Sequence, residues 1–190
     1  GMDAFAESPE WGGSLVIFPF MYYETYGDDS LIKKYYQHMR RYTDYLKTRA
    51  DNGILSFGLG DWYDYGDFRA GFSRNTPVPL VATAHYYMTV MYLIKAARMV
   101  GNEFDVRYYS SLAHDIMVAF NKRFLDSNTA QYGTGSQASN ALPIFLQMTQ
   151  STGDKGDYTP DASLTAKVLT NLIKDVESHG NRLTTGDVGN

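Results

Sequence analysis

The side chains best suited to binding a carbohydrate lie in residues 55–67, LSFGLGDWYDYGD. This stretch holds a tryptophan, two tyrosines and three aspartates beside glycines that free the backbone. The C–H face of a sugar ring packs on an indole, and carboxylate oxygens accept the protons of its hydroxyl groups. A structural role also fits, in which the rings cover one end of a helix bundle and the aspartates face water. The residues alone leave both interpretations open.

Helices must position this loop, and the rest of the chain predicts them. Apolar periodicity, capping residues and helix-ending glycines predict six helices, at about 15–26, 31–49, 80–100, 102–125, 137–149 and 160–180. The first is apolar nearly all round, so we expect protein to enclose it on most sides. Pro19 is expected to restrict its first turns or to mark its true start. The second, fourth and sixth are amphipathic, with one face toward water.

Enclosed and amphipathic helices alternate three times, which predicts three antiparallel hairpins with inner helices against outer ones. The predicted fold class is all-α, as a single segment over residues 1–190. Antiparallel hairpins place every outer-to-inner link at the same end of the layer. The links 50–79 and 126–136 and the residues after 180 should therefore meet the start of the first helix at one rim. We expect Trp11 and Trp62 to line a common hollow there.

Paired carboxylates are the catalytic groups that such a rim could offer. Cleavage of a glycosidic bond needs a protonated acid and a second carboxylate as base or nucleophile. The acidic residues expected at the rim are Glu10, Asp61, Asp64, Asp67 and Asp187. The sequence does not distinguish a desolvated carboxylate from one that only binds hydroxyl groups, so no catalytic pair is named.

Other chemistries lack their signatures. The histidines His38, His85, His114 and His179 show no paired metal spacing, and each fits a helix surface or a packing position better than a ligand site. Residues 133–136, GTGS, have the wrong spacing for a nucleophile elbow. Residues 58–60, GLG, lack the third glycine of a dinucleotide site. We therefore expect neither a metal nor a cofactor.

Composition limits the partners. The 190 residues carry a net charge of −4, so there is no basic excess to neutralise the phosphates of a nucleic acid. No apolar run reaches membrane-spanning length and no signal peptide opens the chain, so no membrane partner is expected. The absence of cysteine leaves the compartment open. Both ends look trimmed, with Gly1 before Met2 resembling a tag-removal scar.

Four motifs, taken in order, resemble a known family. They are EWGG at 10–13, GDW at 60–62, YGTGSQASNA at 132–141 and TGDVG at 185–189. Together they resemble the middle of the catalytic domain of bacterial α-L-rhamnosidases, glycoside hydrolase family 78. The resemblance covers essentially the whole chain. It implies an (α/α)6 barrel, of which three hairpins would form about half.

The resemblance also implies an inverting hydrolase that releases terminal L-rhamnose, in a periplasmic or extracellular parent. It implies that Trp11 and Trp62 wall the sugar pocket and that Asp61 makes a supporting polar contact. Many members have an aspartate where this chain has Gly13, so that contact is missing or supplied by Glu10. The family's general acid and general base lie before and after this segment. We therefore expect the 190-residue chain to be catalytically inert.

Two alternatives remain open. Other six-hairpin enzymes include glucosidases and polysaccharide lyases, and a lyase could use Tyr63 or Tyr65 as its base. The second alternative is a non-enzymatic solenoid of helical repeats that binds peptides, although the unequal hairpins and uncapped ends disfavour it. An open half-barrel would also expose apolar flanks, so we expect copies of the chain to associate through them.

Overall fold

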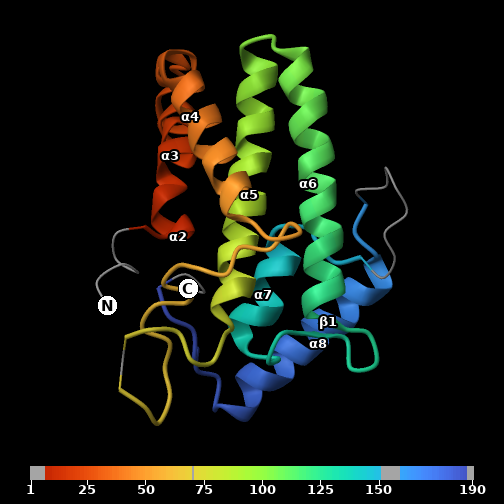
Figure 1. Cartoon of the computed structure of the whole chain (residues 1–190). Coiled ribbons are helices and arrows are strands. Elements are labelled where there is room, and N and C mark those ends of the chain that lie inside the picture. The colour runs from red at the N-terminus through yellow and green to blue at the C-terminus, as the bar shows by residue number, and fades with distance from the viewer. Residues whose placement is uncertain (1–6, 70, 151–158, 188–190) are drawn as a thin grey trace.

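The computed structural model describes residues 7–69, 71–150 and 159–187. Its helices are α2 (Pro9–Gly12), α3 (Ser14–Tyr26), α4 (Ser30–Arg49), α5 (Val78–Met99), α6 (Glu103–Phe124), α7 (Gln137–Phe145) and α8 (Ala162–Ser178). The short strands β1 (Leu125–Asp126) and β2 (Gln131–Tyr132) form an antiparallel pair. Figure 1 shows α4, α5 and α6 running alongside one another, with α8 crossing below them at an angle. The predicted all-α fold is thus confirmed, with one small β-hairpin added.

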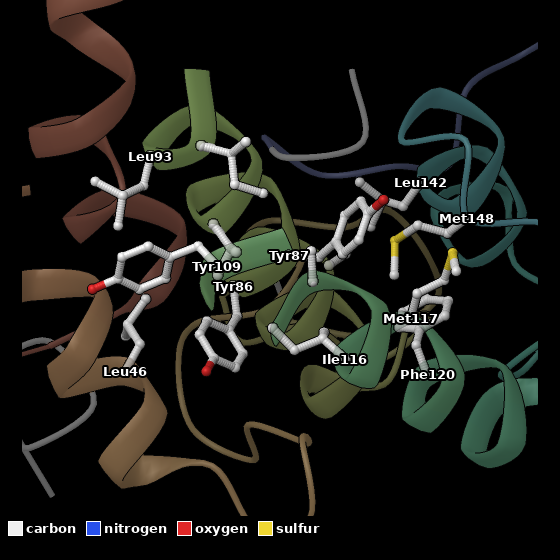
Figure 2. Close-up of a cluster of buried hydrophobic side chains, with 14 of the residues drawn as sticks. Leu46, Tyr86, Tyr87, Leu93, Tyr109, Ile116, Met117, Phe120, Leu142 and Met148 are labelled. Atoms are coloured by element: carbon white, nitrogen blue, oxygen red, sulfur yellow. The ribbon is translucent and has the colours of Figure 1, made fainter. Parts of the chain in front are cut away.

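Helix α5 forms the centre of the molecule and packs against α2, α3, α4, α6 and α7. Nearly every turn of it is buried, which agrees with its almost continuous apolar sequence. Figure 2 shows the core extending from Leu46 of α4, past Tyr86 and Leu93 of α5, to Phe120 of α6 and Leu142 of α7. Each large apolar side chain buried in this way contributes about 1.5–3 kcal/mol to the free energy of unfolding.

The three predicted hairpins are present as α3–α4, α5–α6 and α7–α8, and the two helices of each hairpin are in contact. Gly27 and Gly101 make the tight connections of the first two, with φ of +70° and +74°. Left-handed backbone of this kind favours glycine, because a Cβ is unfavourable there. At the start of α6, Oδ1 of Asn102 accepts the backbone N–H of Asp105 at 3.1 Å, as the predicted cap requires.

The expectation that protein encloses the first helix is wrong for this chain. Phe18 is 60% exposed and Met21 55% exposed, and Leu15 is exposed as well. Only Val16, Pro19 and Phe20 are buried. These side chains are exposed because α3 lies at the edge of the layer and packs against α4 and α5 with only one side. Pro19 also lies inside α3 and does not mark its start.

The fifth helix ends earlier than predicted, at Phe145 instead of Thr149. Gln147 has φ of +57°, which no α-helical residue adopts. The backbone N–H of Met148 closes a wide turn on the carbonyl of Pro143 at 2.8 Å. The apolar residues beyond 145 misled the prediction, because they enter the core from a turn.

Candidate functional site

Segments that are far apart in the sequence meet at one end of the helices, as predicted. Glu10 in α2 accepts the backbone N–H of Gly60 at 3.1 Å. The backbone N–H of Asp187 donates to the carbonyl of Trp62 at 2.8 Å. The hydroxyl of Thr134 donates to the carbonyl of Asn75. Figure 1 shows α2, the loop between α4 and α5 and the residues after α8 at this end. These segments form the rim.

Both carboxylate oxygens of Glu10 help to hold the rim together. Its Oε1 accepts from Gly60, and its Oε2 accepts the hydroxyl proton of Ser8. The carboxylate also lies against Gly58, where a Cβ would stand 2.6 Å from Oε2. Gly58 has φ of +133°, so both its conformation and the lack of space require glycine. Glu10 thus anchors the loop 50–77 on α2.

Asp61 is completely buried. Its Oδ2 accepts the backbone N–H of Gly186 at 2.9 Å. A Cβ on Gly186 would stand 2.2 Å from the carbonyl oxygen of Trp62, so only glycine permits this approach. Asp61 therefore joins the C-terminal segment to the loop from beneath the surface.

The two tryptophans are the accessible members of the predicted set. Trp11 is 56% exposed on α2, and Trp62 is half-buried. The Trp62 ring stands edge-on to Phe72, with centroids 5.1 Å apart, and to Tyr63, at 5.2 Å. Tyr63 has φ of +64°, which is an unfavourable backbone conformation for a tyrosine. The turn that it makes lies directly beside the Trp62 indole. Of the four predicted residues, Trp11 is thus exposed, Trp62 and Glu10 are half-buried, and Asp61 alone is completely buried.

Asp64 organises the second half of the loop. Its Oδ2 accepts the backbone N–H groups of Arg74 at 2.7 Å and of Asn75 at 2.5 Å. The side chain of Asn75 in turn donates to the carbonyls of Tyr65 and Thr184, at 2.7 and 3.2 Å. Asp67 and Asp187 are exposed to solvent. The structure therefore gives the rim carboxylates different roles, which the sequence could not separate.

His85 is the residue of this region that sequence reasoning assigned only to a helix surface or a packing position. It is buried on α5, and its Nδ1 lies 2.9 Å from the carbonyl oxygen of Val81. Burial lowers its pKa below the ordinary 6.5, while the Val81 carbonyl and the charges of Glu10 and Asp61 act in the opposite direction. His85 therefore lies within electrostatic reach of the carboxylates of Glu10 and Asp61. In the sequence, the one indication of this proximity is that His85 lies about two helical turns after the start of α5, which is the end of that helix at the rim.

An open cavity of about 650 Å³ also lies at the rim, between the loop 65–75, the turn 134–136 and the end of α8. Neither Trp11 nor Trp62 lines it. The common hollow expected between the two indoles therefore stays a prediction. Among the described residues there is no cluster of His, Asp and Glu that could hold a metal ion, and no helix long and apolar enough to span a membrane.

Comparison with known proteins agrees with the helical-hairpin fold. The family model of the bacterial alpha-L-rhamnosidase 6 hairpin glycosidase domain matches residues 1–190. An alpha-L-rhamnosidase of Formosa agariphila is 29% identical over 121 residues, which are 61% of this chain and 12% of that protein.

Solved structures agree as well. The alpha-L-rhamnosidase of Dictyoglumus thermophilum matches with a TM-score of 0.83 and 29% identity, over 96% of this chain and 20% of that one. The Streptomyces avermitilis alpha-L-rhamnosidase complexed with L-rhamnose matches with a TM-score of 0.79 and 21% identity, over 94% of this chain and 16% of that one. At 21% identity the likeness shows the fold alone. The chain spans at most a fifth of each of these three proteins.

The family match decides between the alternatives that the sequence left open. A helical-repeat binding module, a polysaccharide lyase and a six-hairpin glucosidase are all disfavoured, because the match is to a rhamnosidase glycosidase domain and extends over the whole chain. The three hairpins correspond to part of its six-hairpin architecture. The chain belongs to the family of bacterial α-L-rhamnosidase six-hairpin glycosidase domains.

Proposed function

We propose that this chain supplies one wall of the sugar-binding site of an inverting α-L-rhamnosidase, a glycoside hydrolase that removes terminal L-rhamnose. The observation that carries the proposal is the hydrogen bond between Glu10 and Gly60, which joins the segments bearing Trp11 and Trp62. The Asp61–Gly186 bond ties the C-terminal segment to the same loop. The two indoles are accessible at this rim and offer flat apolar faces to the C–H side of a pyranose ring.

Glu10 and Asp61 position these rings and supply the polar side of the site. Each already accepts a backbone N–H from another segment, which fixes the loop that carries Trp62. A carboxylate has about four acceptor positions, so the half-buried Glu10 can accept a further proton from a sugar hydroxyl, whereas the completely buried Asp61 acts by holding the loop. His85 of α5 lies within electrostatic reach of both carboxylates.

The 190-residue chain is catalytically inert on its own in this proposal. Inverting hydrolysis needs an acid and a base on opposite sides of the sugar, separated by room for a water molecule. The half-buried Glu10 and the buried Asp61 and Asp64 instead accept hydrogen bonds from the protein. These three carboxylates hold the loops in place. In this proposal the catalytic acid and the catalytic base come from other parts of the parent enzyme.

Intrinsic fluorescence tests the sugar-binding role directly, because the chain has two tryptophans and both are candidate residues. Titration with L-rhamnose should change the emission of the unmodified chain. Trp11→Phe and Trp62→Phe each leave one reporter, and each single variant should still respond. Trp11→Ala and Trp62→Ala should weaken binding about fivefold to tenfold, as expected for the loss of one stacking ring.

Tyr26→Ala is the matched control, since Tyr26 is an exposed aromatic at the end of α3 away from the rim. It should leave the response to L-rhamnose unchanged, and D-glucose should cause a smaller response. An emission that stays constant up to high L-rhamnose concentration would contradict the proposed site. Release of the aryl group from an aryl α-L-rhamnoside above a buffer blank would contradict the inertness of the chain.

We also propose that copies of this chain associate through their exposed apolar edges. At one edge α3 exposes Leu15, Phe18 and Met21, and at the other α8 exposes Leu169 and Ile173. Large apolar side chains exposed at two edges favour a protein partner. Light scattering should show a mass above the monomer that falls with dilution, and Phe18→Ser with Met21→Ser should shift it toward the monomer.

Glu24→Ser is the control for this association, since it removes an exposed polar residue from the same helix. It should leave the mass unchanged. A strictly monomeric profile at the highest concentration would rule out association of copies.

A further inference from the structure

A groove of about 430 Å³ lies between α4 and α6, which flank α5 on its two sides (Figure 1). Two side-chain hydrogen bonds bridge these helices. The hydroxyl of Tyr36 donates to Oδ2 of Asp105 at 2.5 Å, and the hydroxyl of Tyr109 donates to Oδ1 of Asp44 at 2.7 Å. Tyr109 lies about 22 Å along α6 from Phe124, the end of that helix at the rim. The groove is therefore separate from the proposed rhamnose site.

Two aromatic rings of α6 are exposed at this groove. Phe104 is 68% exposed and Tyr108 is 40% exposed, and both line it. Their ring centroids are 6.3 Å apart and their planes differ by only 10°. The ring of Tyr109 stands edge-on to that of Tyr108, with centroids 5.0 Å apart, and helps to hold its orientation. The two rings thus offer nearly parallel apolar faces to a ligand.

Lys47 and Asp44 place hydrogen-bonding groups beside these rings. Nζ of Lys47 donates to the hydroxyl of Tyr108 at 2.6 Å, and an ammonium group has two further N–H donors. Oδ1 of Asp44 accepts from Tyr109, and a carboxylate has about four acceptor positions. The groove therefore supplies donors and acceptors next to an apolar ring face. The hydroxyl groups and the C–H face of a sugar need this combination.

The charges that line the groove balance. Arg40 and Lys47 are the cations, and Asp44 and Asp105 are the anions. Nε of Arg40 lies 3.1 Å from Oδ2 of Asp105, so this pair is already formed. A balanced groove gives no net attraction to a charged ligand, and it therefore suits an uncharged one. Because these side chains already contact one another, a ligand loses little affinity in ordering them.

We propose that this groove is a second carbohydrate-binding site, which takes an uncharged chain of pyranose rings. Phe104 packs against the C–H face of one ring, Tyr108 extends that surface, and Lys47 and Asp44 bind hydroxyl groups. Binding here does not depend on the rim. Its role in the parent enzyme rests on the proposed function: a glycan held at the groove raises the local concentration of its chain ends at the rim.

NMR titration of the 190-residue chain with cellotriose tests this site, because cellotriose is an uncharged chain of three pyranose rings. The ring signals of Phe104 and Tyr108 should shift and saturate. Phe104→Ala should weaken binding about fivefold, whereas Phe104→Tyr should retain it, since it keeps the ring. Lys47→Met keeps the apolar stem but loses the donors, and it should weaken binding about threefold.

Phe145→Ala is the matched control, because Phe145 is 75% exposed at the end of α7 and lies outside the groove. It should bind cellotriose as the unmodified chain does. Circular dichroism should show the same helix content in Phe104→Ala, since the ring that it removes is exposed. No saturable shift at Phe104, an unchanged affinity in Phe104→Ala, or an equal loss in Phe145→Ala would each overturn the proposal.

Glycerol tests the need for a sugar ring, because it has hydroxyl groups but no ring face. It should leave the signals of Phe104 in place, and a shift equal to that caused by cellotriose would overturn the proposed stacking.

Tryptophan emission reports on the rim and the Phe104 signals report on the groove, so the two sites are measured separately. No tryptophan response to L-rhamnose, together with Phe104-dependent binding of cellotriose, would reject the rhamnose site and leave the groove as a carbohydrate site. A tryptophan response to L-rhamnose without a cellotriose shift at Phe104 would reject the groove alone.

Discussion

The backbone N–H of Gly186 lies 2.9 Å from Oδ2 of Asp61, a residue that precedes it by 125 positions and is completely buried. This bond joins the end of the described chain to the loop that carries Trp62. A Cβ on Gly186 would stand 2.2 Å from the Trp62 carbonyl oxygen, 2.6 Å from that of Asp61 and 2.7 Å from the backbone N of Asp64. The C-terminal segment can therefore lie here only because position 186 is glycine.

Gly186→Ala should displace this segment and change the environment of Trp62. Overpacking of this kind typically costs about 1–3 kcal/mol. We expect a lower urea midpoint together with a shift in tryptophan emission. Gly27→Ala is the control, because Gly27 has φ of +70° and no atom within 4 Å of the added Cβ. It should reduce stability without changing the emission, and equal emission shifts in both variants would contradict the packing argument.

Tyr36→Phe should destabilise the contact between α4 and α6. The Tyr36 hydroxyl donates to Oδ2 of Asp105 at 2.5 Å, and Nε of Arg40 lies 3.1 Å from the same oxygen. Burial and this hydrogen bond raise the pKa of Tyr36, so the hydroxyl stays a donor throughout the neutral range. Loss of a hydrogen bond to a charged, buried acceptor costs about 1.5–3 kcal/mol.

Urea unfolding measures this cost, with Tyr35→Phe as the control at the preceding position. The Tyr35 hydroxyl makes no hydrogen bond within the part of the chain that the structure describes, so its removal should change the free energy of unfolding by less than about 0.5 kcal/mol. Equal costs for the two variants would show that the bond to Asp105 contributes nothing.

The stability of the chain should fall as the pH drops below about 6.5, in part because of His85. Burial lowers the pKa of His85 in the folded state, so the unfolded state binds the proton more tightly. Stability contributed by neutral His85 is therefore complete above the unfolded value of 6.5 and is lost as the pH falls toward the folded value. The charges of Glu10 and Asp61 reduce the effect without reversing it.

Unfolding free energies measured from about pH 5 to 7.5 test this slope, whose upper limit is about 1.4 kcal/mol per pH unit for one proton. His85→Asn should flatten it, since asparagine does not titrate and its amide can still reach the Val81 carbonyl. His38→Asn, at an exposed position on α4, should leave the slope unchanged. A slope that persists unaltered in His85→Asn would assign the pH dependence to other groups.

Asn140→Ala should loosen the turn between β2 and α7. The buried Asn140 accepts the backbone N–H of Tyr132 at 2.9 Å and donates to the carbonyl of Gly135 at 3.3 Å. Removal of the amide leaves buried backbone groups without partners, at a cost of about 1–3 kcal/mol. Hydrogen exchange at the Tyr132 amide should accelerate more than exchange in the centre of α5. Unchanged protection at Tyr132 would show that the strand pair holds the turn by itself.

The sequence predicted the elements that depend on neighbouring residues. The bounds of five of the six predicted helices agree with the structure to within about two residues, because apolar periodicity, the Asn102 cap and the glycines at 27 and 101 act locally. It also predicted that the loop ends would meet at one rim, because antiparallel hairpins impose this geometry. The error at Thr149 arose where apolar residues enter the core from a turn.

Only the tertiary structure decided what each rim residue does. In the sequence Asp61, Asp64 and Asp67 are equivalent acidic residues of one loop. The structure buries Asp61 beneath Gly186, uses Asp64 to fold the loop and leaves Asp67 exposed beside a cavity with two arginines. The pairing of Asp105 with Tyr36 and the position of His85 beside two carboxylates were equally hidden from the sequence. Burial and hydrogen bonding depend on segments up to 125 residues apart, and no local pattern encodes which of them will touch.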